Sequence, residues 1–196
     1  MKPWRVIRGL PNLVWQNLIA SVRMNESRAG AELRRWIYGT ECHIDTMVHI
    51  TNKRNFACGE GCALYHGTYV LNGEGTLHLG EQSHLGAFCF VNVQHGSVWI
   101  GDHVAIGPGT KIIAYSNHYK KGRKVTEERV TEPVRLGNNV FIGANCTILP
   151  GTVVHDDVVI GAGSVVRGEL AGNAIYAGAP CKEIRRGWYA SVRGTS

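Results

Sequence analysis

A single histidine opens the longest polar stretch of the sequence. Residues 118–135 are rich in Lys, Arg and Glu and contain few apolar residues, and His118 is the first of them. A neutral imidazole, whose ordinary pKa is near ~6.5, can accept the proton of a hydroxyl group that attacks a carbonyl carbon. Long polar loops on regular scaffolds usually serve function. We therefore predict that His118 faces a groove and acts as a general base.

Basic residues gather at the two ends of a chain whose formal net charge is +6. Residues 1–40 carry seven Lys or Arg against two Glu, and the tail carries Lys182, Arg185, Arg186 and Arg193 against Glu183. Such an excess suits nucleic acid, an anionic lipid surface or a phosphorylated ligand. The sequence contains no recognised DNA-binding motif and no aromatic platform for RNA, so we expect no nucleic-acid partner.

The elements that must position these residues are set by a period of six. Between residues 136 and 166 every sixth residue is apolar and branched, and small or β-branched residues precede most of them by two positions. A period of six fits neither an amphipathic helix nor a single strand, so it indicates a repeat. We predict a short strand and a turn in each hexad, three hexads in each triangular coil, and parallel pairing between stacked coils. The apolar positions are Leu136, Ile142, Ile148, Val154, Ile160 and Val166.

The same period divides the chain into three parts. It begins faintly at Ile44 and continues to residue 176, with slips of a few residues that we interpret as turn insertions. The stretch 118–135 is expected to be a loop extruded from one corner of the solenoid. Residues 1–43 are expected to form a helical cap, with one helix from Pro11, a break at Gly30 and a second helix over 31–38. Residues 177–196 are expected to form a tail with a short helix.

The cysteines and histidines indicate the cellular compartment of the protein and whether it binds a metal ion. The six cysteines form no C-x-x-C pair, and Cys89 and Cys146 fall on small interior positions of their hexads, so a reducing, cytoplasmic compartment is expected. The sequence contains no run of ~18 apolar residues, so we expect no transmembrane helix. The nine histidines supply no ligand set of the kind that a catalytic zinc ion requires, so we expect no metal.

Several motifs in fixed order resemble one family. The bare hexads are shared by several classes of protein, whereas the Asn-His pair before the loop and the Ala-Gly-Ala-Pro terminus are more specific. The chain resembles the hexapeptide-repeat acetyltransferases, in the branch of the maltose, galactoside and Nod-factor O-acetyltransferases, over about residues 79–186. The resemblance implies an all-β fold, the left-handed parallel β-helix. The motifs are Ile106-Gly107-Pro108-Gly109-Thr110, Ser116-Asn117-His118, Ile142-Gly143-Ala144, Ile160-Gly161-Ala162-Gly163-Ser164 and Ala177-Gly178-Ala179-Pro180.

The resemblance also assigns roles to individual residues. It makes His118 the catalytic base and acetyl-CoA the co-substrate, and it places Asn92 and Asn117 at the acceptor. The family has a carboxylate between the acceptor asparagine and the base, whereas this chain has none there and His95 occupies that segment. The acceptor identity therefore stays open. The residues that would bind coenzyme A are Ala144, Ala162, Arg167, Lys182 and Arg185.

These observations favour an acetyl-CoA-dependent O-acetyltransferase that modifies a sugar hydroxyl in surface polysaccharide or oligosaccharide biosynthesis. Two alternatives stay open: an N-acetyltransferase of a nucleotide-linked amino sugar, and a β-helix scaffold that has lost activity. We expect a homotrimer with sites between subunits, because a closed threefold would bury the hexad faces beside the loop. Residues 1–40, with the apolar face of Trp15, Leu18 and Ile19, are expected to cap the solenoid or to contact the acceptor or the inner face of the membrane.

Overall fold

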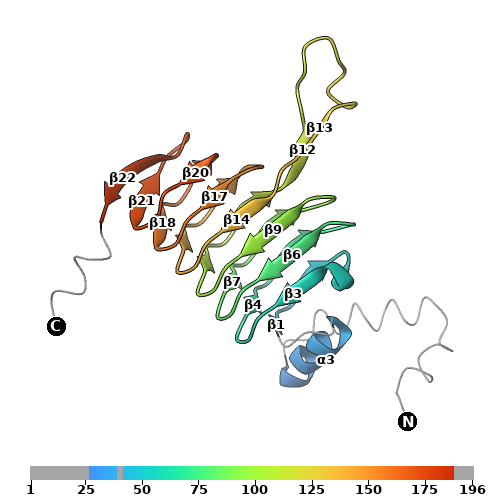
Figure 1. Cartoon of the computed structure of the whole chain (residues 1–196). Helices are drawn as coiled ribbons and strands as arrows, with labels where there is room; N and C mark the ends of the chain where they lie inside the picture. Colours follow the sequence, from blue (N-terminus) through green and yellow to red (C-terminus); the bar gives the residue numbers. More distant parts are fainter. Residues whose placement is uncertain (1–26, 39–41, 188–196) are drawn as a thin grey trace.

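The computed structural model describes residues 27–38 and 42–187, and most of them form a parallel β-helix of triangular section (Figure 1). Three parallel sheets, here called A, B and C, are its walls. Sheet A contains β1 (His43–Ile44), β4 (Ala63–Leu64), β7 (His84–Leu85), β10 (Ala105–Ile106), β15 (Phe141–Ile142), β18 (Val158–Ile160) and β21 (Ala174–Ala177). Sheet B contains β2 (His49–Ile50), β5 (Tyr69–Leu71), β8 (Phe90–Asn92), β11 (Lys111–Ile113), β16 (Thr147–Ile148) and β19 (Val165–Val166). Sheet C contains β3 (Phe56–Cys58), β6 (Thr76–Leu79), β9 (Ser97–Ile100), β14 (Val134–Leu136), β17 (Val153–Val154) and β20 (Glu169–Leu170).

Each coil contributes one strand to each wall, which confirms the fold class expected from the hexads. The chain passes from sheet A to B to C, so it turns an A–B, a B–C and a C–A corner in every coil. We number the coils from β1, which places β7 and β8 in coil 3, β10 and β11 in coil 4, and β15 and β16 in coil 5. Consecutive strands of a sheet lie ~4.8 Å apart, so coil number measures height along the axis.

The apolar hexad residues form the core. Ile106, Ile142 and Ile160 are in register in sheet A, and none is more than 1% exposed. Each isoleucine withdrawn from water in this way stabilises the fold by roughly 1.5–3 kcal/mol. The small positions beside them are also buried: Thr110 is fully buried and donates its hydroxyl to the carbonyl of Gly143 in the next coil, at 3.0 Å. The core is therefore one column that fixes the register of every corner.

The hexad glycines let successive corners approach closely. A Cβ atom added to Gly143 would lie 2.5 Å from the backbone nitrogen of Ala162 in the next coil. Real Cβ atoms do not make such contacts, so this position requires glycine. The corner backbone is consequently exposed on its outer side and rigid on its inner side.

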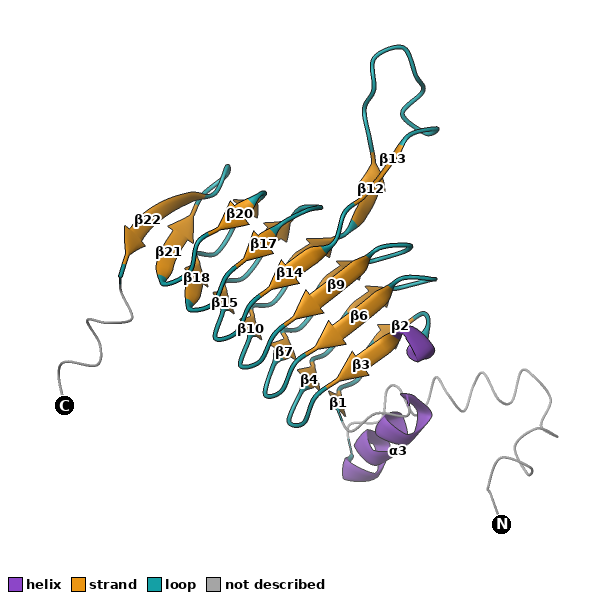
Figure 2. Ribbon diagram, in the orientation of Figure 1, coloured by secondary structure: helices purple, strands orange, loops and turns teal. Residues whose placement is uncertain are grey.

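One helix lies at the first end of the prism (Figure 2). Helix α3 (Arg28–Tyr38) begins after Ser27, whose hydroxyl accepts a hydrogen bond from the N–H of Gly30. The expected break at Gly30 is therefore wrong: this glycine lies in the first turn, where the capped N–H stabilises the helix start. Arg34 is buried and donates to the carbonyl of Ile44, at 2.7 Å, which attaches the helix to coil 1. A short 3-10 helix, η1 (Lys53–Asn55), lies in the B–C corner of the same coil.

At the other end of the prism, the short helix expected in the C-terminal tail is not found among the described residues. Residues 182–186 form a strand, β22 (Lys182–Arg186), and not a helix. The strand pairs antiparallel with β21, with Ala177 opposite Lys182 and Ile175 opposite Arg185. The last strand of a parallel stack has unpaired backbone groups along its edge, and β22 satisfies them. This gain in hydrogen bonds outweighs the helix propensity of the segment.

The division into residues 1–43, 44–176 and 177–196 stays a prediction. The helix expected from Pro11 lies outside the described residues. No helix in the part of the chain that the structure describes is long and apolar enough to cross a bilayer.

Candidate functional site

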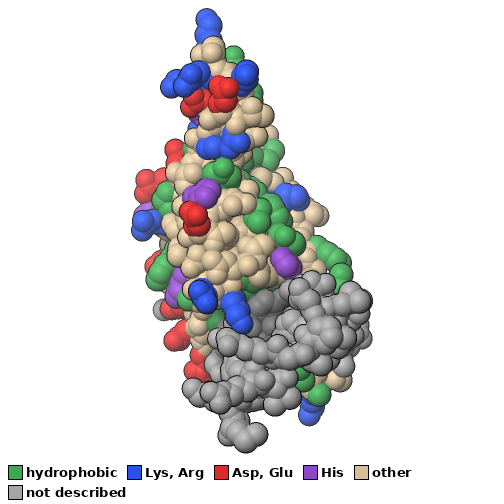
Figure 3. Space-filling model, turned by 90° about the vertical axis from the view of Figure 1, so that its right-hand side faces the viewer, with side chains coloured by type: hydrophobic (Ala, Val, Ile, Leu, Met, Phe, Trp, Pro, Cys, Tyr) green, Lys and Arg blue, Asp and Glu red, His purple; other side chains and the backbone are tan. Residues whose placement is uncertain are grey.

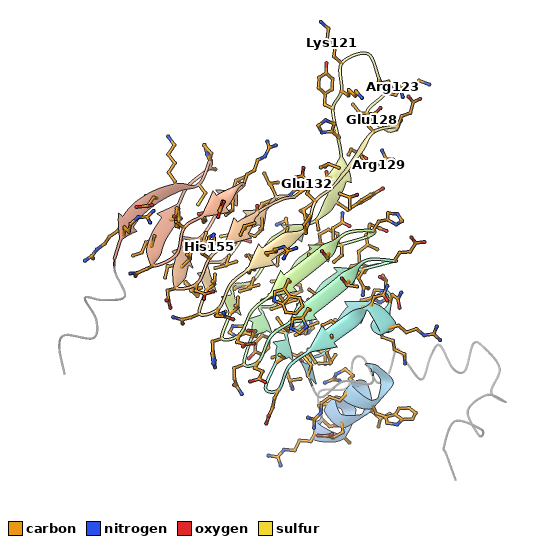
Figure 4. All side chains as sticks on the ribbon, viewed as in Figure 1. Lys121, Arg123, Glu128, Arg129, Glu132 and His155 are labelled. Atoms are coloured by element: carbon orange, nitrogen blue, oxygen red, sulfur yellow. The ribbon has the colours of Figure 1, made fainter. Side chains whose placement is uncertain are left out.

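A β-hairpin projects from the B–C corner of coil 4. Its strands are β12 (Tyr115–Asn117) and β13 (Arg129–Thr131), and it stands clear of the prism in Figure 1 and Figure 3. The extruded loop expected over 118–135 is thus a hairpin whose paired stem begins before His118, while Val134 already belongs to sheet C and is fully buried. Figure 4 shows Lys121 and Arg123 near the tip and Glu132 at the base.

His118 is held at the first residue beyond the stem. Its backbone N–H donates to the carbonyl of Glu128 across the hairpin, at 3.1 Å, and its side chain is exposed. The imidazole makes no hydrogen bond or ion pair with any residue that the structure describes. Asn117 pairs with Arg129 in the stem and is also exposed. The backbone of His118 is therefore fixed while both ring nitrogens are available to a ligand.

Asn92 lies directly under the hairpin. Its side-chain nitrogen donates to the carbonyl of Tyr115, at 2.9 Å, which fixes the orientation of the amide because only the NH₂ group can donate. Its Oδ1 atom is buried and has no hydrogen-bond partner among the described residues. A buried acceptor without a donor costs stability, and such atoms commonly bind a ligand or water. A hydroxyl group at this position would satisfy it.

A carboxylate reaches this corner from a different coil. A protonated Nδ1 of His95 donates to Oε2 of Glu74, with the two atoms 3.1 Å apart, and the His95 ring meets Tyr115 edge to face with centroids 5.4 Å apart. Arg129 then donates to the Tyr115 hydroxyl, at 3.2 Å. The sequence indicated His95 but missed Glu74, because the two residues are 21 positions apart and meet only through coil stacking.

The residues expected to bind the co-substrate lie on other elements. Ala144 and Ala162 follow hexad glycines at the A–B corners of coils 5 and 6, and neither N–H donates a hydrogen bond within the described residues. Arg167 is exposed at the B–C corner of coil 6, and Lys182 and Arg185 are exposed on β22. These three cations form no ion pair with described residues, whereas Arg186 is bound to Glu183 and lowers the pKa of that carboxyl through their hydrogen bond.

The structure brings only part of this set together in one chain. Asn92, Asn117, His118 and Arg167 share the B–C corners, whereas Ala144 and Ala162 lie on the A–B corners at the opposite edge of sheet B. The width of sheet B separates the two groups. In a single chain the predicted base and the predicted donor-binding residues therefore lie on opposite edges of sheet B.

Buried thiols take no part in this arrangement. Cys89 and Cys146 are buried beside the core, and burial raises the pKa of both, that of Cys89 to about 11. The interior position predicted for them is confirmed. Thiols of this kind are poor nucleophiles. Among the described residues no group of three or more His, Cys, Asp or Glu side chains is arranged to hold a metal ion.

Comparison with known proteins identifies the repeat. Residues 133–168 match the family model described as bacterial transferase hexapeptide (six repeats). Residues 133–168 are therefore a hexapeptide-repeat segment. It is 34% identical over 111 residues to the galactoside O-acetyltransferase of Escherichia coli (strain K12), covering 54% of this chain and 55% of that relative. It is 27% identical over 142 residues to the galactoside O-acetyltransferase of Lactococcus lactis, covering 72% and 68%. The resemblance drawn from the motifs is confirmed.

Solved structures agree on the fold of the chain. A galactoside acetyltransferase in complex with coenzyme A gives a TM-score of 0.70 at 24% identity, over 90% of this chain and 80% of that one. AntD, an N-acyltransferase from Bacillus cereus in complex with dTDP and 3-hydroxybutyryl-CoA, gives 0.72 at 21% identity, over 87% and 94%. The all-β, left-handed parallel β-helix is therefore confirmed. The chain spans about half the length of the Escherichia coli relative.

Proposed function

We propose that this protein is an acetyl-CoA-dependent O-acetyltransferase whose acceptor is a sugar hydroxyl. One observation carries the proposal: His118 is exposed, its ring makes no hydrogen bond with a described residue, and it stands at the end of a hairpin stem whose first residue, Tyr115, is bonded to Asn92. In the proposed site His118 deprotonates the acceptor hydroxyl, and Asn92 supports the hairpin that carries His118 through its bond to Tyr115. The curated relatives named galactoside O-acetyltransferase support the same chemistry.

The reaction needs one proton transfer and one exchange of bonds. His118 takes the proton of the acceptor hydroxyl as its oxygen attacks the thioester carbonyl carbon, so that a C–O bond forms. The C–S bond then breaks, the thiolate leaves, and the imidazolium returns the proton to give free thiol. Backbone N–H groups near the attacked carbonyl would stabilise the oxyanion in between. The products are an acetyl ester and coenzyme A.

The described residues fit the acetyl-CoA donor along the axis of the prism. The free N–H groups of Ala144 and Ala162 can bind the amide carbonyls of its extended arm, and Lys182 and Arg185 can bind its phosphates with charge-assisted hydrogen bonds. Sheet A places β10, β15, β18, β21 and β22 in this order. Four strand spacings of ~4.8 Å give roughly 19 Å between coil 4, which carries His118, and the cations of β22.

A homotrimer would complete the site. Sheet B lies between the A–B and B–C corners, so a threefold axis facing sheet B brings the A–B corner of one subunit against the B–C corner of the next. The outer face of sheet B carries apolar side chains among polar ones such as Lys111 and Thr147, and its apolar side chains are half-buried or exposed in the single chain, where an interface would cover them. Its apolar outward residues are Tyr69, Leu71, Phe90, Ile113, Leu149 and Val165.

The proposal extends to the class of acceptor, the biosynthetic role and the cellular location. Relatives that include a putative lipopolysaccharide biosynthesis O-acetyl transferase of Escherichia coli support a role in surface polysaccharide or oligosaccharide biosynthesis. We place the reaction in the cytoplasm, where acetyl-CoA is made, with residues 1–40 as the segment that would contact the membrane surface. Transfer to the amine of a nucleotide-linked sugar is the alternative, and an acceptor panel containing both classes distinguishes them.

Replacing His118 with alanine tests the proposal. We expect kcat for thiol release from acetyl-CoA to fall about 10²–10⁴-fold, because a positioned base contributes that much, while acetyl-CoA binding changes little. His103, exposed at the C–A corner of coil 4, provides the control, and His103→Asn should keep wild-type turnover. A His118→Ala enzyme with near wild-type kcat would contradict the assignment, and His95 would be tested next.

A further inference from the structure

Phe88 and Met47, at equivalent A–B turn positions of coils 3 and 1, have a backbone conformation that bulky side chains disfavour. Phe88, in coil 3, has a φ of +59°, in the left-handed region that bulky residues rarely adopt. The equivalent turn positions of coils 2, 4, 5 and 6 are Gly67, Gly109, Asn145 and Gly163, which are residues suited to that region. Glycine or asparagine at position 88 would therefore relieve the strain. Strain of this kind at an exposed side chain raises the question of what the side chain binds.

The Phe88 ring is displayed on the surface and its position is fixed. Its side chain is 64% exposed, so it adds little to the core. Its N–H donates to the carbonyl of His66, at 2.8 Å, and its ring meets the His66 ring edge to face with centroids 5.3 Å apart. His66 is held in turn by the Thr46 hydroxyl, at 2.6 Å from Nδ1. The ring also lies over Gly67, where a Cβ atom would come within 2.6 Å of it.

The height of Phe88 along the axis matches the acceptor and not the donor. Phe88 lies in coil 3, the coil whose strand β8 ends at Asn92, whereas Ala144 and Ala162 lie on the same A–B corner in coils 5 and 6. In a threefold assembly facing sheet B, equal heights meet, so Phe88 of one subunit faces Asn92 and His95 of the next. An aromatic ring on one side and amide and imidazole groups on the other fit a pyranose, which has apolar C–H faces and polar edges.

We propose that Phe88 is a specificity-determining residue of the acceptor site, supplied by the neighbouring subunit, and that it packs against the C–H face of a pyranose ring. The inference rests on the proposed function. It adds that the acceptor is cyclic where it is acetylated and that no single chain holds a complete acceptor pocket.

The test uses two acceptors that share their hydroxyl pattern but differ in the ring: methyl β-galactoside and the open-chain polyol galactitol. Phe88→Asn should raise the KM for methyl β-galactoside about tenfold and leave kcat/KM for galactitol and the KM for acetyl-CoA unchanged. The thermal midpoint should not fall, because asparagine tolerates the left-handed conformation. Phe88→Tyr keeps the ring face and should retain the wild-type KM.

Met47 supplies a matched control. It occupies the same turn position in coil 1, with a φ of +59° and a 49% exposed side chain, but lies two coils from Asn92. Met47→Asn should leave both acceptor constants unchanged. The inference is overturned if Phe88→Asn keeps the wild-type KM for methyl β-galactoside. It is equally overturned if the variant loses its trimeric mass at micromolar concentration, since Phe88 would then be an assembly contact. A wild-type protein that releases no thiol with any sugar would instead contradict the proposed function.

Discussion

His84 shows how the surface of a solenoid controls the charge of single side chains. It lies half-buried on the outer face of sheet A, where its ring meets Tyr65 edge to face with centroids 5.6 Å apart. Removal from water disfavours the imidazolium and lowers the pKa of His84 below its ordinary value. The folded protein therefore resists a proton that the unfolded chain accepts.

The consequence is a stability that depends on pH. Above the unfolded pKa of ~6.5 both states hold neutral His84, and the residue contributes no pH dependence. As the pH falls through ~6.5, the unfolded state binds the proton first, so the free energy of unfolding decreases until the lower folded pKa is reached. Urea unfolding at pH 7.5 and pH 5.5 should show a smaller loss for His84→Gln than for wild type. Equal losses in the two proteins would contradict the role of His84.

Two cations at the end of the prism should control affinity for the donor. Lys182→Ala and Arg185→Ala should each weaken acetyl-CoA binding by roughly 1–2 kcal/mol, because each removes one charge-assisted contact with phosphate. Titration calorimetry with coenzyme A and its 3′-dephospho form at two salt concentrations measures the effect. Variants that discriminate between the two forms as well as wild type does would exclude contact with the 3′-phosphate.

At the residue scale the sequence predicts what local patterns encode. His118, Asn117 and the hexad alanines can be found because glycines, the period and the Asn-His pair mark them. The contact between His95 and Glu74 cannot, because it depends on the lengths of two turn insertions that bring separate corners into register. The strain at Phe88 is equally hidden, since phenylalanine in a sequence carries no sign of a positive φ.

At the scale of the elements, periodicity predicts the strands of the repeat reliably, but it predicts the structure at the end of the repeat poorly. Every hexad from residue 136 onward forms the expected buried position, because each branched residue has a single interior to enter. Segment 182–186 was expected to be helical from its composition. The segment instead forms a strand that pairs with the open edge of β21. The residues of the segment alone do not indicate that this edge is available.

The hairpin is an element that should be separable from the fold. Replacing residues 118–128 with a two-residue Asn-Gly turn should leave the thermal midpoint nearly unchanged, because this segment is exposed apart from a few polar contacts. Turnover should fall at least as far as in His118→Ala. Thermal unfolding and thiol release measure the two properties. A shortened protein that retains turnover would place the base elsewhere, and one that unfolds would show that the hairpin stabilises coil 4.

At the scale of the whole molecule, the residues proposed to bind donor and acceptor are ordered by height along the axis of the prism. The cations of β22 lie at one end, the free corner N–H groups follow in coils 6 and 5, His118 lies in coil 4, and Asn92 and Phe88 lie in coil 3. This order fits a long donor that runs along the prism and presents its reactive end to an acceptor at mid-height. A single chain contains all of these residues in this order. However, they lie on two different corners, and sheet B separates the two corners.

Assembly is therefore the property on which the site depends, and mixed trimers test it. We expect a trimer by light scattering at micromolar concentration, and Leu149→Glu on sheet B should dissociate it, because a charge would be buried in an apolar interface. Trp99→Glu provides the control on sheet C, where the indole is 55% exposed, and should leave the mass unchanged.

Two inactive variants then probe the shared site directly. His118→Ala removes the base from the B–C corner, and Ala162→Trp blocks the donor corner at the opposite edge of sheet B. If each site combines one corner from each of two neighbours, co-refolding the variants at equal concentration restores roughly a quarter of the sites by random assortment. Thiol release should recover to about that fraction, although each variant alone is inactive. Co-refolded protein without activity, or a monomeric mass for wild type, would show that each chain works alone.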